Sequence, residues 1–298
     1  MPQAIIDLGT NTFHLLIADE SKNILYEEKM PVRLGVGGIN QNLLTAEGMA
    51  RALQCLTQFK NQCEALGVTN IKAIGTSALR NANNSNEFIA TVKNSTGIHI
   101  LIIDGAQEAQ YIYQGVCAAI PLGTEKHLIM DIGGGSVEFI IAHRHTIFFK
   151  QSFEVGGQRL FENFHQVDPI PIQALSSLHT YLKNTLEPLK PAILTYSPTT
   201  IIGSSGTFET LSDMHCARLG IPNEKLPQSP LTIENFYALK DLLTRSDKMT
   251  RMSLPGMLAW RAEMIVCTCA LIETVLAMHP FKAMKVSRYS LKEGVLFG

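Results

Sequence analysis

The stretch LIMDIGGGS, residues 128–136, places Asp131 where an apolar run meets three glycines and a serine. The stretch AIIDLGTNT, residues 4–12, repeats this arrangement with Asp7 in the aspartate position. Short apolar runs that end in such turns are typical of buried strands. Backbone N–H groups exposed by the turns bind anions, and a strand-end aspartate can hold a hydrated divalent cation beside the anion. The repeated pattern predicts a metal-assisted phosphoryl-transfer site in a cleft between two similar halves.

Length and charge narrow the class of protein. The chain has 298 residues, is 46% hydrophobic and carries a formal net charge of −1. This length is sufficient for sizeable cores and favours two domains. A nearly neutral chain has no overall field to recruit nucleic acid or an anionic membrane, so neither is an expected partner. Any polyanion must be bound by locally placed cations.

The sequence shows no sign of export or membrane insertion. Its N-terminus enters a strand without a basic segment or cleavage site, and no apolar run reaches the roughly 18 residues of a membrane span. The expected location is therefore the cytoplasm. The six cysteines lie mostly in apolar helical patterns without paired CxxC elements, and the histidines lack metal-ligand spacing. The cysteines are expected to be reduced packing residues.

Turn residues divide the first half into a βββαβαβα pattern. Its expected strands are residues 3–8, 12–19, 23–32, one ending near 74, and 98–103, and its expected helices begin at Thr45 and cover 86–93 and 106–119. The pattern restarts after Ile120-Pro121-Leu122-Gly123 with strands near 127–132, 137–142, 145–153 and 200–203, and helices near 157–164 and 170–186 and from Thr207, Thr232 and Pro255. A last strand and helix, residues 284–296, are expected to pack on the first domain. The predicted domains are residues 1–121 with 282–298, and residues 122–281.

Six sequence blocks resemble, in order, the exopolyphosphatase and guanosine pentaphosphate phosphatase (Ppx/GppA) family of the actin, sugar kinase and Hsp70 superfamily. They are residues 4–18, 76–83, 105–109, 131–138, 203–207 and 287–294. The resemblance implies an α/β fold of two duplicated ribonuclease H-like (actin-like ATPase) domains that face an interdomain cleft. It also implies a homodimer. Longer family members carry further C-terminal domains, including an HD-like helical one, which this chain is expected to lack.

Phosphate binding is predicted for both turns, because glycines allow close backbone approach and hydroxyl or amide side chains add donors. The predicted residues are Gly9, Thr10, Asn11 and Thr12 in the first turn and Gly133, Gly134, Gly135 and Ser136 in the second. Ordinary turn chemistry is the alternative explanation. Asp7, Asp131 and Glu138 are predicted to hold a divalent cation, with Mg²⁺ the natural candidate. Their alternatives are a strand-end turn residue and a solvated strand charge.

The resemblance assigns the remaining chemistry. It makes Glu108, which precedes an alanine as in the family pattern, the general base, although a carboxylate there also suits a helix N-terminus. Gln107 departs from the family, which usually has a second acidic residue there. Arg80 is predicted to contact phosphate, with an exposed helix-capping role as the alternative. Candidate polyphosphate contacts, each also explicable as a surface charge, are Arg33, Arg159, Arg261, Arg288 and Lys292.

The preferred function is an exopolyphosphatase that hydrolyses the terminal phosphate of inorganic polyphosphate with Mg²⁺. The nearest alternative is a 5′-phosphohydrolase of guanosine pentaphosphate (pppGpp), which the family carries out with the same residues. An alternative of another class is a non-catalytic actin-like sensor of phosphate compounds. A kinase acting on a small acceptor ranks last, and the absence of a P-loop speaks against a Walker-type NTPase.

Overall fold

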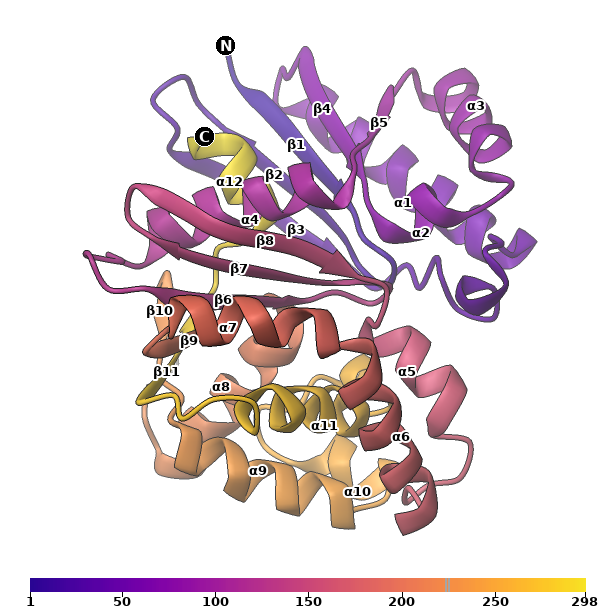
Figure 1. Cartoon of the computed structure of the whole chain (residues 1–298). Coiled ribbons are helices and arrows are strands. Elements are labelled where there is room, and N and C mark those ends of the chain that lie inside the picture. The colour runs from indigo at the N-terminus through magenta and orange to yellow at the C-terminus, as the bar shows by residue number, and fades with distance from the viewer. Residues whose placement is uncertain (223, 225) are drawn as a thin grey trace. The chain divides into compact units, whose positions relative to one another are not determined.

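Two α/β units make up the computed structural model, which describes residues 1–222, 224 and 226–298 (Figure 1). The first unit comprises Met1–Gly115 and Leu291–Gly298, and the second comprises Val116–Ser290. The first contains β1 (Gln3–Leu8), β2 (Phe13–Ala18), β3 (Ile24–Met30), η1 (Ile39–Gln41), α1 (Ala46–Ala65), β4 (Asn70–Gly75), α2 (Ser77–Asn81), α3 (Ser85–Thr96), β5 (Ile100–Ile102), most of α4 (Gly105–Ala119) and α12 (Leu291–Phe297). The second contains β6 (His127–Ile132), β7 (Val137–His143), β8 (Thr146–Phe153), α5 (Gly157–Phe164), α6 (Ile172–Thr185), η2 (Glu187–Leu189), α7 (Lys190–Tyr196), β9 (Thr200–Ser204), α8 (Ser205–Leu219), β10 (Gln228–Ser229), α9 (Ile233–Arg245), α10 (Lys248–Ser253), η3 (Ala259–Arg261), α11 (Ile265–Leu276) and β11 (Ala283–Ser287).

The two sheets share one topology, which confirms the predicted duplicated α/β fold. The first sheet has the order β3-β2-β1-β4-β5, with β1 antiparallel to β2 and parallel to β4. The second sheet, β8-β7-β6-β9-β11-β10, repeats this order with β6 in the place of β1 and adds β10 at its edge. In both sheets the central strand ends in the turn singled out from the sequence.

Register places the two aspartates in equivalent positions but gives them different neighbours. Asp131 on β6 lies opposite Glu138 on β7, whereas Asp7 on β1 lies opposite His14 on β2. Residues directly opposite each other in an antiparallel pair project from the same face of the sheet. The second unit therefore brings two carboxylates together where the first brings a carboxylate and an imidazole.

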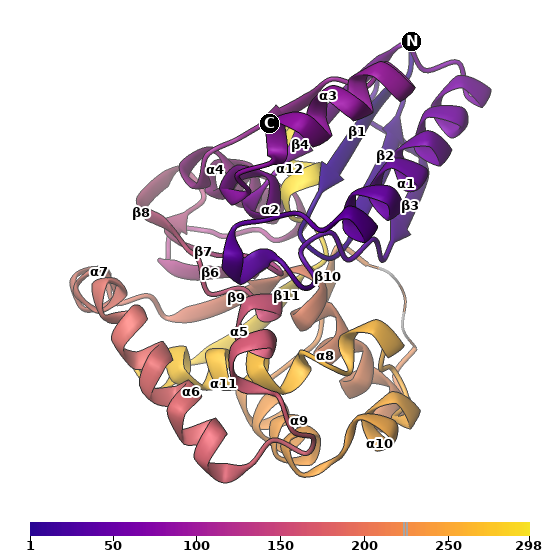
Figure 2. The same cartoon turned by 90° about the vertical axis from the view of Figure 1, so that its right-hand side faces the viewer.

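Alternating side chains of β1 build the core of the first unit on both faces of its sheet. Ala4, Ile6 and Leu8 belong to a buried cluster with residues of α1 and α3, whereas Ile5 packs with Leu296 of α12. Figures 1 and 2 show α1 and α3 on one side of this sheet and α4 and α12 on the other. Helix α1 begins where predicted, because Thr45 Oγ1 accepts a hydrogen bond of 3.1 Å from the N–H of Gly48.

The second unit gathers its helices on one face of its sheet. Its buried cluster combines inward residues of β6, β7, β9 and β11 with apolar residues of α6, α8, α9 and α11. Helix α11 packs against α5, α6 and α9, and is buried along most of its length. The turn after β6 therefore follows a fully buried strand.

Two predictions about the C-terminal part are wrong. Residues 283–287 were assigned to the first domain, but β11 pairs in parallel with β9, and only α12 returns to the first unit. Met284 and Val286 alternate into the core of the second unit, which explains this pairing. The helix expected from Pro255 begins instead at Ile265, since Gly256 takes a left-handed φ of +84° against the backbone of α8.

The cysteines are packing residues, as predicted. All six are free, and all are buried or partly buried. Burial raises the pKa of Cys55 to about 12 and that of Cys63 to about 11, so both thiols stay protonated at neutral pH. Within the described ranges, no helix has the length and apolar character needed to cross a bilayer.

Replacing Gly294 with alanine should destabilise the first unit. A Cβ at this position would overlap the backbone carbonyl of Tyr111, where α12 crosses α4. Overpacking at a backbone contact should lower the unfolding free energy by about 2 kcal/mol. Thermal unfolding monitored by circular dichroism measures the effect, with Asn61→Ala on the exposed face of α1 as the control. Equal melting temperatures for both variants would contradict the close crossing.

Candidate functional site

Backbone hydrogen bonds fix the orientation of the turn after β6. The carbonyl oxygens of residues 133–135 accept hydrogen bonds of 2.8–3.1 Å from the N–H groups of residues 156–158, at the start of α5. In a planar trans peptide the C=O and the following N–H point in opposite directions. The N–H groups of residues 134–136 therefore point away from α5. Those of Gly134 and Gly135 have no hydrogen-bond partner within the described part of the chain, so the turn can accept an anion.

Two further contacts hold this turn against α5. A Cβ at Gly156 would overlap the backbone of Gly134 and Gly135, so glycine permits the close approach. Arg159 Nε donates to the carbonyl oxygen of Gly135 at 2.9 Å, and its Nη2 pairs with Glu154 at 3.0 Å. Arg159 thus braces the turn, and its contact with a polyanion stays a prediction.

The turn after β1 is built in the same way. The carbonyl oxygens of Thr10 and Asn11 accept hydrogen bonds from Gly35 at 2.9 Å and Arg33 at 2.8 Å. The peptide N–H groups of residues 11–12 consequently point away from the loop that contains Arg33. Thr10, Asn11 and Thr12 are all buried, which limits competition from bulk water. All eight predicted phosphate-binding residues thus lie in two turns of one design.

Asp131 is held by three serine hydroxyls. Ser204 Oγ donates to it at 2.6 Å, Ser205 Oγ donates at 2.7 Å, and Ser290 Oγ is also bonded to it. Burial raises the pKa of this carboxyl group, and the three hydroxyl donors oppose that effect. In the sequence, residues 203–207 are included only as a block of the family resemblance, and these serines have no predicted role. The parallel register of β6 and β9 places Asp131 beside Ser204, so a correct strand pairing would have predicted this contact.

Glu138 supplies the second carboxylate on this face. It is 1% exposed and accepts hydrogen bonds from Ser136 at 2.8 Å and Ser152 at 2.6 Å. Two carboxylates opposite each other beside a phosphate-type turn fit Mg²⁺, which prefers oxygen ligands and keeps several waters. Among the described residues, no group of three or more His, Cys, Asp or Glu side chains is arranged to hold a metal ion. Water and phosphate oxygens would therefore complete the coordination.

Glu108 and Arg80 form a part-buried ion pair in the first unit. Arg80 Nη1 donates to Glu108 Oε2 at 2.7 Å and to the carbonyl oxygen of Ile103 at 3.2 Å. Glu108 lies in the first turn of α4 and is 7% exposed. The Arg80 guanidinium and the helix N-terminus both place positive charge beside the Glu108 side chain. Gln107 donates its backbone N–H to Asp104 Oδ1 at 2.7 Å and serves as part of the helix start.

Arg261 is a buried cation of the second unit that interacts electrostatically with Asp131. Its guanidinium packs against Gly206, where a Cβ would overlap it. Burial lowers its pKa, while the charges of Glu209 and Asp131 oppose that shift. Its Nε has no hydrogen-bond partner within the described residues. Arg251, which donates to the Ala262 carbonyl at 2.7 Å, holds the turn that carries Arg261.

Two other predicted polyanion contacts already have acidic partners. Arg288 pairs with Asp213. Lys292 is 8% exposed and pairs with Glu27 at 2.9 Å and with Glu293. A role for either cation in substrate binding stays a prediction.

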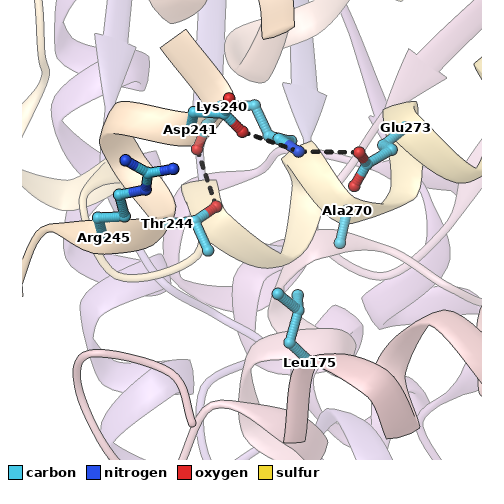
Figure 3. A pocket seen from close by; sticks show the side chains of 7 residues that line it. All are labelled: Leu175, Lys240, Asp241, Thr244, Arg245, Ala270 and Glu273. Atoms are coloured by element: carbon cyan, nitrogen blue, oxygen red, sulfur yellow. Dashed lines mark hydrogen bonds and ion pairs between the residues drawn. The ribbon is translucent and has the colours of Figure 1, made fainter. Parts of the chain in front are cut away.

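A separate cavity in the second unit contains a lysine whose charge is paired with acidic side chains. It has a volume of about 80 Å³ and lies among α6, α9 and α11, as Figure 3 shows, lined by Leu175, Lys240, Asp241, Thr244, Arg245, Ala270 and Glu273. Lys240 Nζ lies 2.8 Å from Glu273 and 3.0 Å from Asp241. Its charge is neutralised within the cavity, which therefore offers a phosphate little attraction.

Comparison with known proteins fits this geometry. The family model described as the Ppx/GppA phosphatase family matches residues 16–298. The chain belongs to the Ppx/GppA phosphatase family. A crystal structure of an exopolyphosphatase from Cytophaga hutchinsonii superposes with a TM-score of 0.96 at 43% sequence identity, covering 100% of this chain and 97% of that one.

Two curated Ppx/GppA relatives carry different names. The chain is 29% identical over 297 residues to a putative exopolyphosphatase of Haemophilus influenzae, covering 99% of this chain and 90% of that protein. It is 28% identical over 297 residues to a guanosine-5′-triphosphate,3′-diphosphate pyrophosphatase of Photobacterium profundum, covering 99% of this chain. This second match spans 58% of the length of the Photobacterium protein.

The protein should be more stable with glycine than with alanine at position 205. It has a left-handed φ of +67°, which costs an L-residue free energy that glycine avoids. Both variants lose the hydroxyl that binds Asp131, so their difference isolates the backbone term. Ser205→Gly should exceed Ser205→Ala by about 1 kcal/mol in unfolding free energy. Thermal melts of the two proteins give the answer, and an alanine variant that melts at or above the glycine variant would refute the strain.

Proposed function

We propose that this Ppx/GppA protein is an exopolyphosphatase that hydrolyses the terminal phosphoanhydride bond of inorganic polyphosphate and releases orthophosphate. The observation that carries the proposal is the pair of turns in which the carbonyl groups accept hydrogen bonds from neighbouring segments and the N–H groups are directed outward. The burial of Glu108 supports it. A polyanion substrate suits such turns because they bind phosphate oxygens without base-specific or sugar-specific contacts. The similarity to the Cytophaga exopolyphosphatase over the whole chain supports the same substrate class.

The proposed roles follow from the local chemistry. Glu108 would accept a proton from the attacking water, and Arg80 would orient Glu108 and balance negative charge. The outward N–H groups of the turns would bind non-bridging phosphate oxygens of the substrate. Asp131 and Glu138 would hold Mg²⁺, which supplies charge neutralisation of phosphate oxygens when bound. Asp7 is proposed as a further ligand through water, and Arg261 as a cation for the chain.

Glu108→Gln should abolish most of the activity while keeping the fold and the binding of polyphosphate. Loss of a general base costs roughly 10²- to 10⁴-fold in rate, and the amide keeps the size of the side chain. The assay is Mg²⁺-dependent orthophosphate release from medium-chain polyphosphate. Glu87→Gln is the matched control, since Glu87 lies exposed in the first turn of α3. Full activity of Glu108→Gln would show that Glu108 is not the general base.

A pppGpp 5′-phosphohydrolase is the second candidate, favoured by the similarity to the Photobacterium pyrophosphatase. The two substrates share a terminal phosphoanhydride, so the same turns and base would serve both. Turnover of polyphosphate and pppGpp at equal terminal-phosphate concentration separates the candidates. We expect polyphosphate to be the better substrate, and a large preference for pppGpp would reverse the assignment.

The sensor function, the homodimer and the cytoplasmic location stay predictions from the sequence. Binding of polyphosphate without any phosphate release by the pure protein would favour the sensor. The expected absence of nucleic-acid and membrane partners also stays a prediction from the sequence.

A further inference from the structure

The loop that braces the first phosphate turn is held by a side chain from outside the loop. Arg51, on α1, donates from Nε to the carbonyl oxygen of Val32 at 2.8 Å and from Nη2 to that of Arg33 at 2.9 Å. Arg51 lies outside the six sequence blocks and is not among the predicted site residues. Its planar fork matches two successive carbonyl groups, an arrangement that a lysine cannot reproduce.

The two turns differ in what supports their braces. The second turn is braced by the start of α5, where helical hydrogen bonds already fix the N–H donors. The first turn is braced by residues 32–35, which belong to no helix or strand, and Arg33 has a left-handed φ of +56°. A non-glycine residue in this conformation persists only where its surroundings impose it. The Arg51 fork is a contact that can impose it.

Peptide planarity links Arg51 to the phosphate turn in two steps. The Val32 carbonyl and the Arg33 N–H belong to one peptide plane and point in opposite directions. Arg51 bonds that carbonyl, and the N–H on the other side donates to the Asn11 carbonyl at 2.8 Å. The Asn11 carbonyl in turn shares a plane with the N–H of Thr12. Fixing one end of this series therefore fixes the direction of the Thr12 N–H.

We propose that Arg51 is a positioning residue that orients the β1–β2 turn for phosphate through the 32–33 and 11–12 peptide units. The assignment rests on the proposed phosphohydrolase function for its catalytic consequence, but not for the bracing itself. Arg51 is an exposed residue beside an open groove of about 180 Å³. Its substitution leaves the apolar core intact, so effects on the turn can be separated from unfolding.

The bracing is tested by hydrogen–deuterium exchange of the full chain, comparing wild type with Arg51→Ala, Arg51→Lys and Gln54→Ala. Gln54 lines the same groove on the same helix and is the matched control. Arg51→Ala should raise exchange in peptides covering residues 8–13 and 31–36 and leave other regions and the melting temperature unchanged. Exchange in Arg51→Lys should lie between that of wild type and that of Arg51→Ala, and exchange in Gln54→Ala should match wild type. Unchanged exchange at residues 8–13 in Arg51→Ala would overturn the proposal.

The catalytic consequence is tested with the same proteins and medium-chain polyphosphate. A misplaced donor should reduce kcat/KM roughly 10-fold in Arg51→Ala, and methylguanidinium added to the assay should restore part of it. Faster exchange at the turn with unchanged kcat/KM would refute a positioning role in the reaction. If wild type releases no phosphate from polyphosphate or pppGpp, the proposed function fails, whereas the exchange comparison still decides whether Arg51 braces the turn.

Discussion

The rest of the candidate site depends on the backbone hydrogen bonds accepted by the carbonyl groups of the β1–β2 and β6–β7 turns. A glycine-rich turn can present either its carbonyls or its N–H groups to a ligand. Here α5 takes the carbonyls of residues 133–135, and the loop at 33–35 takes those of residues 10–11. Planar peptides then direct the N–H groups outward. The outward direction of these N–H groups, on which the proposed phosphate binding rests, is thus a consequence of segments that follow the third strand of each sheet.

Duplication of the fold has been followed by divergence of its chemistry. Strands β1 and β6 each carry an aspartate one residue before their end, but its partner in register is Glu138 in the second unit and His14 in the first. The second unit is accordingly the better candidate for holding a hard cation, with its carboxylates oriented by serine hydroxyls. The first unit contains the Arg80–Glu108 ion pair, in which Glu108 is the proposed general base.

Local pattern was sufficient to predict the strands other than β10, the two turns and the start of α1, because each depends on residues close together in sequence. Features set by distant residues were missed. The pairing of β11 with β9 cannot be read from the alternation of β11 alone. Ser204 and Ser290 contact Asp131 from 73 and 159 residues away, and Arg51 contacts Val32 from 19 residues away. The apolar pattern around Pro255 resembled a helix, but a left-handed Gly256 prevents one.

The most direct test of the account is an NMR titration of the ¹⁵N-labelled, catalytically disabled Glu108→Gln chain with tripolyphosphate and Mg²⁺. The account predicts that the backbone amide resonances of Gly134 and Gly135 shift on binding, together with that of Thr12, because these N–H groups point outward from braced turns. Saturable shifts confined to other parts of the chain, with these three amides unmoved, would contradict the assignment of the turns as the phosphate-binding elements.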